Sequence, residues 1–222
     1  MISPTQHLAP LYPRSPIQVA VLLFATGGIY GFYWAYKVRR WCEATLEKPN
    51  QALWKTIALV VPIFNLFLLF DLGQLVNGAC FRANLPRPQV NLPMLGLSTF
   101  FINLLWRLPD PYWFLSLFDF IPLTIIYSYM YRSQLRLNGA VAAPQKFTWF
   151  EWVIVTLGCL VLLLATFGAA VQLPGEAPVQ SPWFPVVVQV MALFALFLLN
   201  RNSAAIVRDA LIESKSTPSV ER

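Results

Sequence analysis

The sequence predicts an all-α fold, a polytopic transmembrane helical bundle of about six spans arranged as helical hairpins. Three observations support this prediction: the composition, a series of long apolar segments and the positions of the tryptophans. Of the 222 residues, 57% are hydrophobic and only 12% are charged, about half the charged fraction of a soluble domain. So few charges cannot cover a globule in water, and a large part of the surface is therefore expected to face lipid.

Six apolar segments account for the expected spans. They are 17–38, 52–76, 92–108, 112–135, 148–173 and 182–200. A helix needs about 20 residues to cross the hydrocarbon core, so the third segment is marginal. The second segment leaves an alternative open. It either spans the membrane or breaks near Pro62 and Asn65 and re-enters, which requires protein or water around the broken backbone.

The tryptophans mark the ends of these segments. All eight lie near an expected span end: Trp34, Trp41, Trp54, Trp106, Trp113, Trp149, Trp152 and Trp183. Indole is amphipathic and prefers the headgroup level, so this distribution is typical of an aromatic belt.

The chain divides into a tail, a membrane domain and a second tail. Residues 1–16 are proline-rich, residues 17–213 are expected to form the transmembrane helical domain, and residues 214–222 are expected to form a disordered C-terminal tail. Within the domain, Pro62 and Gln74 recur as Pro122 and Gln134 at an offset of 60 residues. This similarity indicates a repeated helical hairpin.

The sharpest local motif lies in the first segment. Gly27 and Gly31 are four residues apart, and Tyr30, Tyr33 and Trp34 surround them. Small residues at this spacing let another helix approach closely. We therefore expect a packing interface for a partner helix, within the protein or on another subunit. A generic span end with an aromatic belt is the other interpretation.

Residues 26–34 read T-x-G-I-Y-G-x-Y-W, and residues 61–65 and 121–123 carry prolines within apolar segments. These stretches resemble the first helix and the proline-broken helices of a family of small bacterial multi-span membrane proteins of unknown function. The resemblance implies a bacterial inner (cytoplasmic) membrane location and no assigned activity. The chain is longer than the usual family pattern, which would make the last two spans an addition.

Polar residues within spans are candidates for function, because a carboxylate at the bilayer centre costs about 2.5–3.5 kcal/mol on insertion scales. Asp119 is the best of these candidates, at a depth of about 10 Å. Arg107 ends the preceding segment and is expected to pair with Asp119, although an ion or proton site is the alternative. Asn65 lies at the proline break. Asp71 is expected to be in contact with water at the exit of its segment.

The sequence contains no motif for several common kinds of functional site. No nucleophile–base pair, phosphate-binding loop or metal-binding helix occurs, so the chain is predicted not to be an enzyme. Cys42, Cys80 and Cys159 are far apart and His7 lies in the N-terminal tail. We therefore predict no metal site and no cofactor, while a bound lipid or a pigment without a histidine ligand stays possible. The basic residues are scattered, which argues against nucleic-acid binding.

Two functional hypotheses follow. The first is a non-enzymatic accessory or scaffold subunit that packs against membrane lipids and other membrane-protein subunits. The alternative is a small-solute or ion permease that uses Asp119, Asn65 and the proline breaks. A lipid-modifying membrane enzyme is a third and weaker idea.

Overall fold

The computed structural model describes residues 14–109, 112–138, 146–170 and 184–216. All regular structure within these ranges is helical, which confirms the all-α fold class. The helices are α1 (Pro16–Ala25), α2 (Tyr30–Thr45), α3 (Ala52–Ala58), α4 (Pro62–Arg82), α5 (Leu92–Leu104), η1 (Leu105–Arg107), η2 (Tyr112–Asp119), α6 (Phe120–Asn138), α7 (Trp149–Ala170) and α8 (Phe184–Ser216). Three described helical stretches are long and apolar enough to cross a membrane: Pro62–Arg82, Tyr112–Leu137 and Trp149–Gly168.

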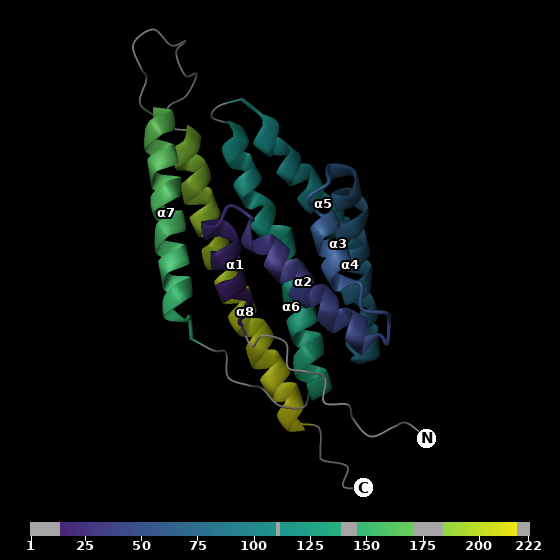
Figure 1. Cartoon of the computed structure of the whole chain (residues 1–222). Coiled ribbons are helices and arrows are strands. Elements are labelled where there is room, and N and C mark those ends of the chain that lie inside the picture. The colour runs from purple at the N-terminus through teal and green to yellow at the C-terminus, as the bar shows by residue number, and fades with distance from the viewer. Residues whose placement is uncertain (1–13, 110–111, 139–145, 171–183, 217–222) are drawn as a thin grey trace, which may run out of the picture.

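Helix α6 occupies the centre of the bundle (Figure 1) and packs against α1, α4, α5 and α8. Helix α7 stands at one edge, where it contacts α1 and α8, and α4 packs against α5 at the other edge. The core follows from this arrangement, because α6 and η2 contribute fully buried side chains such as Phe114, Phe120 and Ile126. Phe24 of α1 meets the Phe120 ring edge-on, with 5.6 Å between the ring centroids.

The first expected span, 17–38, is not one continuous helix. Helix α1 ends at Ala25 and α2 begins at Tyr30. Between them Gly27 and Gly28 have φ angles of +55° and +87°, in the left-handed region that glycine adopts without steric cost. The Thr26 hydroxyl joins the two helices, because it donates to the Leu22 carbonyl at 2.8 Å and accepts from the Tyr30 N–H at 3.0 Å.

The second expected span is divided as well. Residues 59–61 separate α3 from α4, and Val61 is extended with φ −84° and ψ 119°. Proline disfavours a helical conformation in the residue before it and fits the first position of a helix, so Pro62 both ends one helix and starts the next. Helix α4 is long enough by itself to cross a membrane and runs to Arg82 rather than Val76.

The remaining segments agree closely with the described helices. The fourth segment begins as a 3-10 helix, η2, and becomes α-helical at Phe120, so that Pro122 also stands in the first turn of an α-helix. Helix α8 runs on to Ser216 and so includes residues that the sequence analysis assigned to the C-terminal tail. Residues 1–13 and 217–222 of the two expected tails lie outside the described residues.

Glycines allow the closest helix contacts. A Cβ atom at Gly73 of α4 would overlap the Leu92 carbonyl, and one at Gly96 of α5 would overlap the Leu69 carbonyl. This reciprocal contact brings the two backbones together along the α4–α5 hairpin. In the same way, Gly158 of α7 lies against the Ala25 carbonyl at the end of α1.

Candidate functional site

A partly open pocket with a cavity volume of about 60 Å³ lies where the α1–α2 turn, the α3–α4 break, α5 and the end of η2 converge. We call it the Asp119 pocket. Its polar lining consists of Trp34, Asn65, Thr99, Asn103 and Asp119. The two backbone breaks therefore lie at the same site, although they are more than 30 residues apart in the sequence.

Asp119 is the last residue of η2 and only 5% of it is exposed. Its carboxylate lies against the backbone of Gly28, where an added Cβ atom would be 2.9 Å from Oδ2. Any side chain at Gly28 would therefore displace the carboxylate. The glycine turn that interrupts the first expected span is what makes room for Asp119.

The expected ion pair between Asp119 and Arg107 does not form. Arg107 is exposed at the end of η1, and no described residue forms an ion pair with Asp119. Burying the guanidinium group beside this carboxylate would cost its hydration, which disfavours the pair. Asp119 is thus a buried carboxylate without a described counter-ion.

Two other polar atoms of the pocket lack partners. Trp34 is 3% exposed, and its indole Nε1 has no hydrogen-bond partner among the described residues; the same holds for the buried Oδ1 atom of Asn65. Leaving a buried polar group unsatisfied costs about 1–3 kcal/mol. Thr99 differs, because its hydroxyl donates to the Leu95 carbonyl at 3.1 Å. The residues that line the pocket therefore carry one unsatisfied donor, one unsatisfied acceptor and one carboxylate.

Several of these residues were predicted from the sequence. The structure brings Gly31, Trp34, Asn65 and Asp119 together in the pocket. The signal that selected Asn65 and Asp119 was polarity inside an apolar segment. Gly28, Thr99 and Asn103 were missed, since only their tertiary contacts place them at the site.

The other predicted residues lie elsewhere. Gly27 is in the α1–α2 turn, and no atom would lie within 4 Å of an added Cβ there. The spacing of Gly27 and Gly31 predicted a shared helix face. This prediction is wrong, because Gly27 lies outside both helices. Tyr33 is exposed, and its ring lies beside Tyr30 at 5.7 Å between centroids. The role of these residues in contacting a partner stays a prediction.

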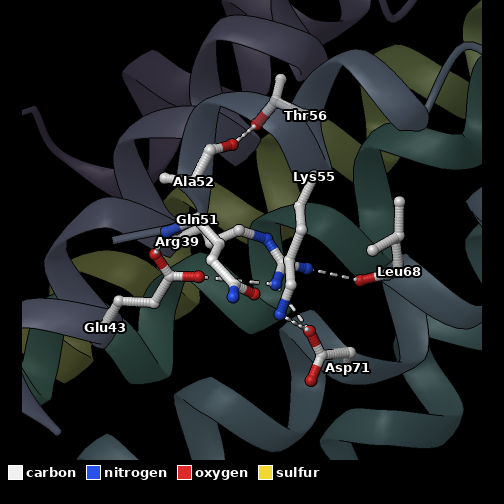
Figure 2. Close-up of polar contacts among 8 residues, drawn as sticks. All are labelled: Arg39, Glu43, Gln51, Ala52, Lys55, Thr56, Leu68 and Asp71. Atoms are coloured by element: carbon white, nitrogen blue, oxygen red, sulfur yellow. Dashed lines mark hydrogen bonds and ion pairs between the residues drawn. The ribbon is translucent and has the colours of Figure 1, made fainter. Parts of the chain in front are cut away.

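Asp71 belongs to a second polar cluster (Figure 2), in which Arg39 and Lys55 converge on its carboxylate. The Arg39 Nη1 atom lies 2.6 Å from Asp71 Oδ2 and 3.9 Å from Glu43 Oε1, and its Nη2 donates to the Leu68 carbonyl at 2.9 Å. Arg39 directly follows the first expected apolar segment, 17–38, yet it is only 1% exposed. Asp71 is partly exposed, as expected, but it is also paired.

The two clusters differ in what they can do chemically. The Arg39 cluster satisfies its own charges and links α2 to α3 and α4, so it is a structural brace. The residues of the Asp119 pocket include a carboxylate without a described ion pair and two unsatisfied polar atoms, for which a ligand could supply partners. In the part of the chain that the structure describes, no group of three or more His, Cys, Asp or Glu side chains could hold a metal ion.

Comparison of the chain with protein-family models, with curated proteins and with solved structures finds no match. The resemblance of residues 26–34 to a bacterial membrane family therefore stays a prediction. The geometry of the Asp119 pocket carries the functional argument.

Proposed function

We propose that this protein is a non-enzymatic integral membrane protein, a small-solute or ion permease, that binds its substrate in the Asp119 pocket. The observation that supports this function is a buried carboxylate without a described ion pair beside an unsatisfied indole N–H and an unsatisfied amide oxygen. We place the protein in a bacterial inner membrane, in line with the resemblance of residues 26–34.

The energetics favour a ligand at this place. A carboxylate inside a span costs about 2.5–3.5 kcal/mol on insertion scales, and each unsatisfied polar atom costs about 1–3 kcal/mol more. These costs are offset when a solute supplies the missing charge and hydrogen bonds. Asp71 has no such need, because Arg39 and Lys55 already neutralise it.

The test measures thermal unfolding of the protein in nanodiscs with three probes: sodium chloride, ethanolamine hydrochloride and glycerol. A ligand that binds only the folded state at 100 times its Kd stabilises it by about 2.7 kcal/mol. We expect one probe to raise the Tm of the wild type and to leave the Tm of Asp119→Asn unchanged. Glu47→Gln, which alters an exposed pair with Arg82, is the control and should respond like the wild type. A wild type that responds to none of the probes contradicts the proposal.

A second candidate function is an accessory subunit that packs against other membrane proteins, and the exposure of α7 favours it. Leu163 and Phe167 of this helix are 61% and 69% exposed. Such a helix faces either acyl chains or the helix of another subunit.

The exposed Cys159 of α7 separates these two environments, because Cys42 and Cys80 are buried. A spin label on Cys159 is expected to be immobilised in native membranes, where a partner is present, and mobile in nanodiscs that contain lipid only. Equal mobility in both preparations would leave lipid as the only neighbour of α7 and remove this candidate.

A further inference from the structure

We infer that the ligand of the Asp119 pocket is a small organic ammonium that also carries a hydrogen-bond acceptor, as an amino alcohol does. This inference rests on the proposed function of the pocket. It names the chemical class of the ligand, which the proposed function leaves open.

The charge of the pocket indicates a single positive charge on the ligand. Asp119 is the only ionisable side chain among the residues that line the pocket in the described part of the chain. One carboxylate balances one monovalent cation. A divalent ion such as Ca²⁺ is usually held by several oxygen ligands that include more than one carboxylate, and the lining does not provide them.

The free hydrogen-bonding atoms indicate both donors and an acceptor on the ligand. The Asp119 carboxylate and the Asn65 Oδ1 atom are acceptors, and a primary ammonium has three N–H donors with which to reach them. The Trp34 indole N–H is a donor and needs an acceptor. A bare alkali cation would leave that N–H unsatisfied, whereas a hydroxyl oxygen beside the ammonium satisfies it.

The walls of the pocket indicate that the ligand contains carbon. Leu59, Leu69 and Leu123 line it together with the aromatic residues Phe32 and Trp34. Apolar walls gain nothing from a hydrated metal ion but favour methylene groups, and an aromatic face attracts an ammonium group. The cavity volume of about 60 Å³ exceeds the roughly 10–15 Å³ that holds one water molecule, so the pocket has space for a ligand of a few heavy atoms.

This chemistry has two sources in a membrane, a free amino alcohol and the headgroup of phosphatidylethanolamine. The experiment therefore has two arms. In the first, the protein in phosphatidylglycerol nanodiscs is titrated by calorimetry with ethanolamine, ethylammonium, ethylene glycol and sodium chloride. In the second, nanodiscs that contain phosphatidylethanolamine are titrated with ethanolamine, and native mass spectrometry detects lipid retained on the protein.

In the first arm we expect ethanolamine to bind at least tenfold more tightly than ethylene glycol or sodium. Ethylammonium lacks the acceptor and should bind about tenfold more weakly than ethanolamine. Trp34→Phe should abolish the difference between these two amines. Asp119→Asn should weaken ethanolamine binding more than tenfold.

The adjacent glycines provide a matched pair of variants that keeps Asp119 itself intact. Gly28→Ala and Gly27→Ala both place a side chain at positive φ, but only the former puts it against the Asp119 carboxylate. We expect Gly28→Ala to lose ethanolamine binding, while Gly27→Ala retains the wild-type affinity. Equal affinities for these two variants would overturn the inference even if Asp119→Asn did not fold.

The outcomes separate the inference from the proposed function. If ethylene glycol or sodium binds and ethanolamine does not, the ligand class is wrong and the permease proposal stands. If no probe binds in the first arm and no headgroup is retained in the second, both are wrong. In the second arm, retained phosphatidylethanolamine that blocks free ethanolamine identifies the headgroup as the source. Unchanged binding of ethanolamine identifies the free solute.

Discussion

Two stretches of span length, the central Tyr112–Leu137 and the peripheral Trp149–Gly168, have opposite environments in this bundle. The first is 67% buried and the second 11% buried, measured over the most apolar window of each. Their mean hydropathies are 1.3 and 2.2, so the less hydrophobic stretch is the inner one. In a lipid solvent the hydrophobic side chains need no burial, whereas polar side chains need protein partners. The polarity of a span thus indicates its place in the bundle.

The hydrogen bonds of α6 show how the central position meets this need. The Ser128 hydroxyl donates to the Thr124 carbonyl at 2.8 Å, and the Tyr127 hydroxyl donates to the Arg14 carbonyl at 2.8 Å. The Ser133 hydroxyl donates to the Tyr129 carbonyl at 3.0 Å, and its oxygen lies 3.2 Å from the Cys80 sulfur of α4. The Ser128 and Ser133 bonds to carbonyls lie within α6, and a helix surrounded by lipid could form them too. The contacts with Arg14 and Cys80 need the neighbouring segments of the bundle.

The largest expected change in stability comes from comparing alanine substitutions of one phenylalanine in each stretch. Phe120→Ala should reduce the free energy of unfolding by about 3–5 kcal/mol, because it leaves a cavity in the core, where Phe120 is fully buried. Phe167→Ala removes an equal side chain from the exposed surface of α7 and should change stability by less than about 0.5 kcal/mol. Reversible unfolding in mixed detergent micelles measures both. Similar losses for the two variants would mean that α7 is as enclosed as α6.

A smaller effect is expected where glycines bring helices together. Gly73→Ala forces a methyl group into the Leu92 carbonyl and should cost about 1–3 kcal/mol. Gly168→Ala is the matched control on α7, since no atom would lie within 4 Å of its Cβ, and it should be neutral or slightly stabilising. The same unfolding assay applies. A loss at position 168 equal to that at 73 would show that α7 has a close neighbour there.

The smallest expected effect is on the free energy of unfolding when each of two threonines is replaced by valine, and the two changes should differ in sign. The Thr124 hydroxyl of α6 is buried without a partner among the described residues, so Thr124→Val should be neutral or stabilising by up to about 1 kcal/mol. The Thr166 hydroxyl of α7 donates to the Leu162 carbonyl and accepts from Gln189, so Thr166→Val should destabilise by about 1 kcal/mol. Thermal unfolding in nanodiscs resolves the two. Destabilisation at both positions would assign Thr124 a partner.

Hydropathy located most of the helices, because each long apolar segment contains one, but it did not locate the breaks within them. Gly27 was interpreted, together with Gly31, as part of a continuous packing face, since glycine is frequent within transmembrane helices. The left-handed conformation of Gly27 and Gly28 depends on the turn that Thr26 stabilises. Hydropathy and residue spacing alone do not predict such a turn.

Only part of the candidate site was predictable from the sequence. Asp119 and Asn65 stood out as polar residues within apolar segments. Trp34 was assigned to the aromatic belt, yet its indole is buried in the bundle, whereas Trp54 and Trp149 are exposed as a belt requires. Partners from distant segments, such as Thr99, carry no local signal, because only the packing of α5 brings them to the pocket.

The contact between Gly28 and Asp119 has a consequence for the divergence of this protein. A side chain at position 28 would meet the Asp119 carboxylate, so this position cannot gain one freely while Asp119 is present. In diverged versions of the chain, we expect a larger residue at position 28 to occur together with a smaller residue at position 119. The absence of an atom at one position thus constrains the chemistry allowed at another, 91 positions further along the sequence.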